Sequence, residues 1–455
     1  MKRTFKYIFG SALMLLMISC SDLDKEPISN FSGQGFYKKP SDAQAGVTGI
    51  YNSMQSTFRL NFAYWGEGRA DNVTTKHSGD PLALQTNALT PIITSARWDN
   101  FYTLISRANY AIKYTPGVFG EGESQLKNEL LGQAHGLRAI AYFYLTRIWG
   151  DVPLVTEPYE SVDQNVFVDK NSAQEVLAKV EEDLLFAAEN SSKSYSGAKN
   201  RVIFTKGTAY AFLTQLYMWQ KKYDKAIEMA DKVMSDSQYS LVAMNDWNDI
   251  FVKGVSTESI FEVGYNEVQT NALRILYALG SDSDYVPSAR FIASIETGDL
   301  RKPRIYDVTE AQPRKIWKFF GQGFKDESPE PSSNNIVLTR LADIILLKAE
   351  AHANLNQPTE ALDLLNRIRR RAGLAVLDEA AAISQYKSVA DAILHERSVE
   401  LCFEGHRWFD LVRTGKAIST MKPINGLSNE GNLLWPLHES IRLRNPNLKQ
   451  NEFYN

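Results

Sequence analysis

Three glutamates, Glu396, Glu400 and Glu404, recur at four-residue spacing near the C-terminal end of the chain. A pair of carboxyl groups can hydrolyse a glycosidic bond, provided that an apolar pocket keeps one of them protonated. Arg397 and Arg407 lie within one helical turn of these glutamates, and a nearby cation favours the charged carboxylate. The pattern therefore favours a structural lattice of ion pairs over a catalytic pair.

Charged side chains of both signs continue through residues 396–416 at steps of three or four. On a helix, this spacing places opposite charges next to each other, and it predicts a single charged ridge. An apolar face on a different arc of the helix would pack against the rest of the protein. Gly405 interrupts the pattern, so we expect a bend in the backbone there. The ridge comprises Arg397, Glu400, Glu404, Arg407, Asp410 and Arg413, and the apolar face comprises Leu401, Cys402, Phe409 and Val412.

Two stretches resemble a known family. Residues 396–417, ERSVELCFEGHRWFDLVRTGKA, are similar to the C-terminal signature of the SusD/RagB family of outer-membrane nutrient-binding lipoproteins, and residues 69–73, RADNV, resemble its early motif. The resemblance implies a SusD-like fold, no enzymatic activity and no cofactor. It further implies capture of an oligosaccharide, or of a peptide, and delivery to a SusC-like TonB-dependent transporter in the outer membrane.

The amino terminus reads as a lipoprotein signal. A basic start is followed by an uncharged apolar run, residues 7–18, and then by Ser19-Cys20. The run is shorter than the ~20 residues that a membrane-spanning helix needs, which is typical of a secretory signal peptide. We expect residues 1–19 to be removed and Cys20 to carry lipid that anchors the protein to the outer membrane. An ordinary signal peptide that is cleaved elsewhere is the alternative.

Composition is that of an ordinary globular protein. The chain has 455 residues, of which 44% are hydrophobic and 23% charged, with a net charge of −3. Without a basic field, nucleic acid is not an expected partner. Besides Cys20 there is one cysteine, Cys402, so no disulfide is expected, and its apolar surroundings predict a small buried side chain.

Repeating helix pairs predict a mainly α fold. Residues 205–235 and 334–371 each read as two amphipathic helices with small residues at equivalent positions, similar to a tetratricopeptide hairpin, and residues 125–189 form a weaker copy. Three such pairs suffice for a helical scaffold. Irregular loops and a few short strands would then carry the ligand site. We expect residues 20–215 and 216–455 to be two halves of one continuous domain.

Two irregular segments are the candidates for ligand contact. Residues 62–73 are not periodic and read as an exposed loop, and residues 240–333 are rich in turns and aromatics, with a possible short strand at 316–320. Aromatic faces could stack on sugar rings while polar side chains bond to hydroxyls. A place in the core is the equally weighted alternative for each aromatic. The candidates are Trp65, Asp71, Asn72, Tyr265, Tyr277 and Tyr285.

The chain lacks the common short motifs of catalysis. It contains no glycine-rich phosphate loop, no HExxH, no Cys-x-x-Cys and no Gly-x-Ser-x-Gly, and its six histidines are not at metal-ligand spacing. Neither a metal site nor an enzyme is therefore predicted. Two alternatives stay open: a helical glycoside hydrolase that uses Glu400 or Glu404, and a tetratricopeptide scaffold that binds only protein.

Overall fold

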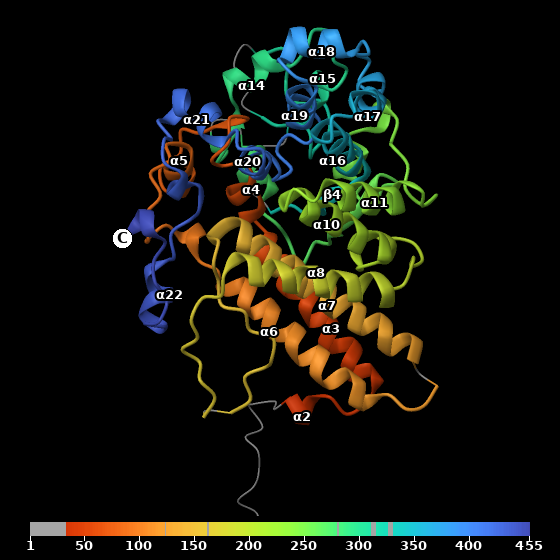
Figure 1. Ribbon diagram of the computed structural model, residues 1–455, viewed down its shortest axis with the longest axis vertical. Helices are drawn as coiled ribbons and strands as arrows, with labels where there is room; N and C mark the ends of the chain where they lie inside the picture. The colour runs from red at the N-terminus through yellow and green to blue at the C-terminus, as the bar shows by residue number, and fades with distance from the viewer. Residues whose placement is uncertain (1–32, 123, 162, 280–281, 311–314, 326–330) are drawn as a thin grey trace, which may run out of the picture.

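The computed structural model describes residues 33–122, 124–161, 163–279, 282–310, 315–325 and 331–455. Helices dominate, and two small two-stranded sheets complete the described part of the chain, so the predicted mainly α fold is confirmed. Figure 1 shows long helices side by side in one half of the molecule and shorter helices gathered in the other. The predicted signal peptide and Cys20 lie outside the described residues.

Four long helices, α3, α6, α7 and α8, build the first half of the molecule. Helix α3 packs on α6 and α7, and α7 packs on α8. Helix α8 starts at a capping box, in which the Ser172 side chain accepts a hydrogen bond from the Glu175 backbone N–H, as expected for a serine at this position. The bounds are α2 Gly33–Phe36, α3 Pro40–Phe58, α4 Asn61–Gly66, α5 Asp80–Gln85, α6 Asp99–Tyr114, α7 Ser124–Trp149 and α8 Ala173–Asn190.

The predicted helical hairpins are confirmed. The pairs α7–α8, α10–α11 and α16–α17 each pack together, and contacts of α8 with α10 and of α11 with α16 stack one pair on the next. Ala209 and Ala349 are fully buried where the helices meet, and their small size permits close approach. A further pair, α18–α19, was not predicted. The bounds are α10 Lys206–Trp219, α11 Tyr223–Met234, α16 Leu341–Asn354, α17 Pro358–Arg371, α18 Glu379–Tyr386 and α19 Val389–Glu400.

Short elements connect the helices. Strand β2 pairs antiparallel with β4, and β1 pairs antiparallel with β3. The predicted strand at 316–320 is wrong beyond a single bridge at Ile316, because the chain turns and the N–H groups of Phe320 and Gly321 both bond to the Trp317 carbonyl. The bounds are β1 Val73–Thr74, β2 Ser259–Val263, β3 Val286–Pro287, β4 Ile336–Arg340, α9 Lys199–Val202, α12 Asp249–Val252, α13 Leu273–Tyr277, α14 Ala289–Ser294 and α15 Lys302–Ile305.

The signature segment is two helices and not one. Helix α19 ends at Glu400, and α20 starts at Arg407 and ends at Arg413, so the predicted continuous ridge is wrong. The predicted bend at Gly405 is confirmed, since Gly405 has a φ of 85°. The turn is fixed by close backbone contact: a Cβ on Gly66 of α4 would lie 1.9 Å from the Gly405 carbonyl oxygen. Two distant parts of the chain therefore meet at these glycines.

The C-terminal tail packs against the end of α7, and Pro436, which has no backbone N–H, prevents a continuous helix there. The Trp149 indole N–H donates to the Pro436 carbonyl at 3.0 Å, and the Asn451 amide donates to the Trp149 carbonyl at 3.1 Å. These bonds hold the tail against the end of α7, and α21 Ala417–Asn425 and α22 Glu439–Arg444 are its helices. Within the described residues, no helix has the length and apolarity needed to cross a bilayer.

Candidate functional site

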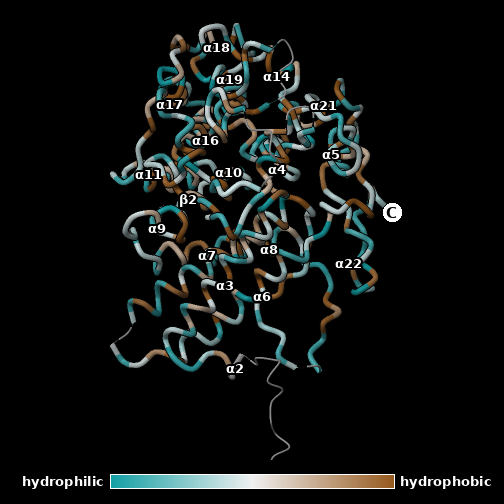
Figure 2. Tube along the Cα trace, turned by 180° about the vertical axis from the view of Figure 1, so that it is seen from behind, coloured by the Kyte–Doolittle hydropathy of each residue, from teal (hydrophilic) through white to brown (hydrophobic). Residues whose placement is uncertain are grey.

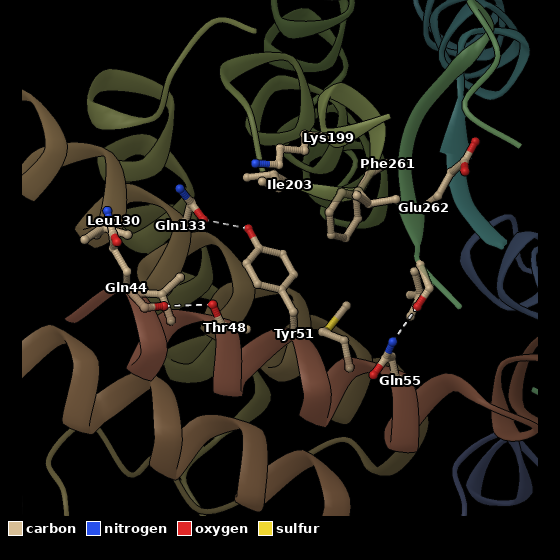
Figure 3. Close-up of a pocket in the computed structure, with 15 residues that line it drawn as sticks. Gln44, Thr48, Tyr51, Gln55, Leu130, Gln133, Lys199, Ile203, Phe261 and Glu262 are labelled. Carbon is tan, nitrogen blue, oxygen red and sulfur yellow. Dashed lines mark hydrogen bonds between the residues drawn. The ribbon is translucent and has the colours of Figure 1, made fainter. Parts of the chain in front are cut away.

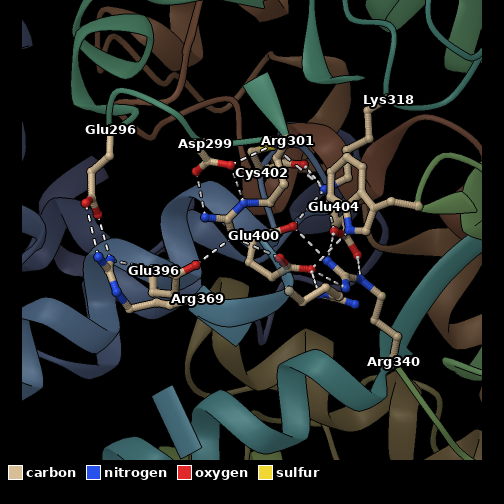
Figure 4. A network of polar contacts seen from close by, with 12 residues as sticks. Glu296, Asp299, Arg301, Lys318, Arg340, Arg369, Glu396, Glu400, Cys402 and Glu404 are labelled. Carbon is tan, nitrogen blue, oxygen red and sulfur yellow. Dashed lines mark hydrogen bonds and ion pairs between the residues drawn. The ribbon is translucent and has the colours of Figure 1, made fainter. Parts of the chain in front are cut away.

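The three glutamates at four-residue spacing lie in the core. Glu396 is 1%, Glu400 0% and Glu404 4% exposed, and Figure 4 shows them among cations contributed by other segments of the chain. We call this cluster the charge core. It consists of Glu258, Asp299, Arg301, Lys318, Arg340, Arg371, Glu396, Glu400 and Glu404.

Arg340 connects most of the charge core. Its Nη1 lies 2.7 Å from Glu400 Oε1, and its Nη2 lies 2.7 Å from Glu404 Oε1. Arg301 Nη1 lies 2.9 Å from the other Glu400 oxygen, and Lys318 Nζ lies 2.5 Å from Glu404 Oε1. The predicted ion-pair lattice is thus confirmed, but its cations come from α17, β4 and two loops and not from the glutamates' own helix.

The cations keep Glu400 and Glu404 ionised. Burial alone would raise the pKa of Glu400, but Arg371, Arg340 and Arg301 outweigh it and hold that pKa well below its usual range. Arg340 and Lys318 likewise hold the pKa of Glu404 below its usual value despite burial. A hydrolase needs one protonated carboxyl beside its substrate. Glu400 and Glu404 offer neither a proton nor access.

The aromatic candidates from the sequence are core side chains. Trp65 is 1%, Tyr265 9%, and Tyr277 and Tyr285 0% exposed. Trp65 stacks on Phe101 at 4.9 Å between ring centroids, and the Tyr277 hydroxyl donates to the Phe403 carbonyl at 3.2 Å. The alternative of a place in the core is thus confirmed for all four aromatics. The exposed loop expected around Trp65 was wrong, because the chain forms helix α4 at Asn61–Gly66 and buries it. That these residues contact a ligand stays a prediction, and no ring face of Trp65, Tyr277 or Tyr285 is open for stacking.

The polar candidates join the two stretches that resemble one family. Asp71 Oδ1 pairs with Arg407 Nε at 2.8 Å, and Asn72 exchanges two hydrogen bonds with Ser398, at 3.1 and 2.9 Å. Asp71 is 9% and Asn72 1% exposed, so the expectation that they face solvent was also wrong. Their structural role is to dock residues 69–73 onto helices α19 and α20.

A groove elsewhere on the molecule has the properties of a binding site. It lies between α6, residues 153–168 and α22 and encloses about 780 Å³, which is within the usual range for ligand pockets. We call it the aromatic groove. Its aromatic side chains are Trp98, Tyr102, Tyr110 and Tyr159, and its polar side chains include Asp99, Thr103, Ser106, Arg107, Arg444 and Asn445.

Hydrogen bonds fix the aromatic rings of the groove. The Tyr102 hydroxyl donates to the Pro153 carbonyl at 2.8 Å, and the Tyr110 hydroxyl donates to the Tyr159 carbonyl at 2.5 Å. Both bonds tie α6 to the loop that forms the opposite wall. Trp98 is 5% exposed, and its ring lies 5.4 Å from that of Tyr102. The groove is therefore preformed.

Several polar groups in the groove remain available to a ligand. The hydroxyls of Ser106 and Tyr159 have no hydrogen-bond partner within the part of the chain that the structure describes. Arg107 uses only Nη1, which donates to the Gly49 carbonyl at 2.6 Å. At the rim, burial alone would raise the pKa of Asp99, but the hydrogen bonds that Asp99 accepts from Arg97 and Arg444 hold that pKa below its usual value. Fixed ring faces and open donors and acceptors thus occur together.

The sequence contains a local signal for one wall of this groove. Trp98, Tyr102, Ser106 and Tyr110 follow one another at four-residue steps, which places them on one face of a helix. Tyr159 could not be found in this way, because it is distant in sequence. Among the described residues, no group of three or more His, Cys, Asp and Glu side chains is arranged to hold a metal ion.

Comparison with known proteins agrees with the fold. The family model described as "SusD family" matches residues 186–454, and a second, described as "Starch-binding associating with outer membrane", matches residues 41–218. The "SusD-like protein P38" of Formosa agariphila is 32% identical, and the match covers 99% of this chain and all of that protein.

Solved structures share the fold over nearly the whole chain. A SusD superfamily protein from Bacteroides thetaiotaomicron superposes with a TM-score of 0.77 at 27% identity, covering 92% of this chain and 99% of that one. A "Laminarin binding SusD-like protein" superposes with a TM-score of 0.77 at 25% identity, covering 92% of this chain and all of that one. Because the model of the SusD family matches more than half of this chain, the chain belongs to the SusD family.

Proposed function

We propose that this protein captures oligosaccharides in the aromatic groove. The observation that carries this proposal is the joint presence of ring faces held in place by hydrogen bonds, from Tyr102 and Tyr110, and of unpaired polar groups, on Ser106 and Arg107. A sugar presents C–H faces that stack on aromatic rings and hydroxyls that need partners, so it satisfies both sets of groups at once. The laminarin-binding structural relative and the starch-binding family description support a glycan over a peptide.

In this proposal, the protein binds its ligand without cleaving it. Glu400 and Glu404, the carboxylates considered for hydrolysis, are buried and ion-paired. Incubation of the protein with laminarin or starch oligosaccharides should produce no new reducing ends. New reducing ends that appear at a rate proportional to protein concentration would favour a hydrolase instead.

We further propose that the protein is anchored by lipid on Cys20 to the outer membrane and delivers its ligand to a SusC-like TonB-dependent transporter. The amino-terminal sequence and the resemblance to the SusD/RagB family support this part. Cys20→Ser should move the protein from the membrane fraction to the soluble fraction of the producing cell. Wild-type protein that fractionates as soluble would contradict the anchor, and failure to co-purify a barrel protein from its own organism would contradict the partnership.

Calorimetry with matched variants tests the site. Laminarin and starch oligosaccharides are titrated into wild type, into Tyr159→Ala and into the control Phe453→Ala, whose ring is 42% exposed and does not line the groove. Loss of an aromatic contact worth about 0.5–1.5 kcal/mol should weaken binding by about 2- to 12-fold in Tyr159→Ala, and Phe453→Ala should match wild type.

Other results of these titrations would contradict the proposal in different ways. Equal affinity in wild type and Tyr159→Ala would remove the aromatic groove as the site. Heat with peptides and none with glycans would make this a peptide-binding protein. No heat with either ligand class, together with capture of a barrel protein, would favour the scaffold that binds only protein.

A further inference from the structure

A second cavity lies away from the aromatic groove. It encloses about 510 Å³ between α3, α7, α9 and β2, with Tyr51 at its centre (Figure 3), and we call it the Tyr51 cleft. Figure 2 shows α9 and β2 on the side of the molecule away from α22, which borders the aromatic groove. The two cavities have no lining residue in common.

The inner polar groups of the Tyr51 cleft are already bonded to protein. The Tyr51 hydroxyl donates to Gln133 Oε1 at 2.9 Å and accepts from the Phe204 backbone N–H at 2.9 Å. Gln133 Nε2 in turn donates to the Tyr195 hydroxyl at 3.0 Å. Gln55 Nε2 donates to the Gly264 carbonyl at 2.6 Å. A ligand rich in hydroxyls would have to compete with these bonds, so the cleft does not suit a sugar.

The remaining inner surface is apolar. Val47, Met54, Leu130, Phe261 and Val263 are each at most 5% exposed as residues, yet all line the cleft. Val202, at the end of α9, and Ile203, directly after it, also line the cleft. A ligand with a hydrocarbon body would bury its surface here without leaving any protein group unsatisfied.

The charge of the cleft is positive at the mouth. Two charged residues line it, Lys199 and Glu262. Glu262 is fully buried, accepts bonds from the Val255 N–H at 2.8 Å and from Asn335 Nδ2 at 2.7 Å, and is thus committed to the protein. Lys199 is exposed, and Figure 3 shows it across the cleft from Tyr51. Its ammonium group has no partner within the described residues, so an anionic head group would find a counter-charge there.

We propose that the Tyr51 cleft binds a single-chain anionic amphiphile, with the alkyl chain between α3 and β2 and the head group at Lys199. This site is separate from the aromatic groove, so amphiphile and glycan bind the protein together. Affinity comes from the chain, and each CH₂ that is added while room remains should tighten binding by about fourfold.

The test uses alkyl carboxylates and the full chain. Acetate, octanoate, decanoate and dodecanoate, each below its micelle concentration, are titrated calorimetrically into wild type and three variants. Wild type should bind one equivalent of each longer carboxylate, and the affinity should rise with chain length. Acetate should not bind measurably. Lys199→Glu should weaken dodecanoate by about 5-fold or more, Ile203→Trp should abolish binding by filling the cleft, and the exposed control Lys449→Glu should match wild type.

The outcomes separate this inference from the glycan proposal. Absence of saturable binding, affinity independent of chain length, or wild-type affinity in both Lys199→Glu and Ile203→Trp would overturn the amphiphile site. Loss of oligosaccharide binding in Ile203→Trp, with a wild-type melting curve, would make the cleft the glycan site and would also overturn the inference. Tyr159→Ala should bind dodecanoate as wild type does, whatever its affinity for glycans.

Discussion

Arg340 should be the side chain on which the charge core depends most. Its Nε lies 2.9 Å from Glu404, its Nη1 lies 2.5 Å from Glu258 and 2.7 Å from Glu400, and its Nη2 lies 2.7 Å from both Glu404 Oε1 and the Glu400 carbonyl. These five bonds use every N–H of the guanidinium group. Removal of the group therefore leaves the carboxylates of Glu258, Glu400 and Glu404 buried with one fewer positive charge beside them.

The size of the effect follows from that imbalance. Loss of one partner from a buried ion pair typically costs about 3–5 kcal/mol. Unfolding entropy of about 2.1 cal/mol/K per residue over 455 residues gives about 1 kcal/mol/K. Arg340→Met should therefore lower the melting temperature by about 3–5 °C. The surface control Lys253→Met, which removes an ion pair with Asp249 at 2.7 Å, should leave the melting temperature unchanged.

Differential scanning calorimetry can test the coupling as well as the loss. Glu404→Gln in the Arg340→Met background removes one of the stranded charges, so it should cost less than Glu404→Gln does in wild type, and the double-mutant cycle should give a coupling of about 1 kcal/mol or more. A melting temperature of Arg340→Met within 1 °C of wild type, or strictly additive effects, would refute the reasoning.

Three further predictions concern buried groups near the signature turn. Burial raises the pKa of Glu67 from 4.5 to about 8, so the folded state holds a proton that the unfolded state releases between these values, and stability falls as pH rises through this window. Glu67→Gln should flatten that fall in urea unfolding at pH 5, 6.5 and 8, whereas a curve parallel to wild type would contradict the assignment. Gly66→Ala should melt far below wild type or fail to fold, since its Cβ would lie 1.9 Å from the Gly405 carbonyl oxygen. The control Gly117→Ala, which has no atom within 4 Å of its Cβ, should melt as wild type does. Equal melting curves for the two variants would contradict the close contact at Gly66. Cys402 is fully buried with its pKa raised to about 12 by burial, so a thiol reagent should label it in Cys20→Ser protein only after denaturant is added, and labelling in native buffer would show that the site opens.

The helical scaffold could be predicted because its signals are local. Ser172 has a cap geometry that depends on the next three residues, and small residues at hairpin contacts such as Ala209 recur at helical spacing. Mixed charges at 396–413 indicated ion pairs, and the structure contains them. The partners of those charges could not be predicted, since Arg340 is sixty-four positions from Glu404 and only tertiary packing brings the two together.

The candidate site could be predicted less well, for a physical reason. Aperiodic sequence around Trp65 suggested an exposed loop, but a short helix that is apolar on all sides is equally aperiodic and lies in the core. The aromatic groove draws its walls from α6, from the loop of Tyr159 and from α22. No local pattern links segments that are separated by up to several hundred residues. Only the face formed by Tyr102 and Tyr110 was readable in the sequence.

A crystal structure with a bound oligosaccharide tests the central claim most directly. Crystals soaked in laminarin or starch oligosaccharide should show an intact sugar chain between α6 and α22, with one ring against Tyr102 or Tyr159 and hydroxyls near Ser106 and Arg107. Ordered sugar at any other place with the groove empty, or a cleaved ligand beside the charge core, would contradict the account.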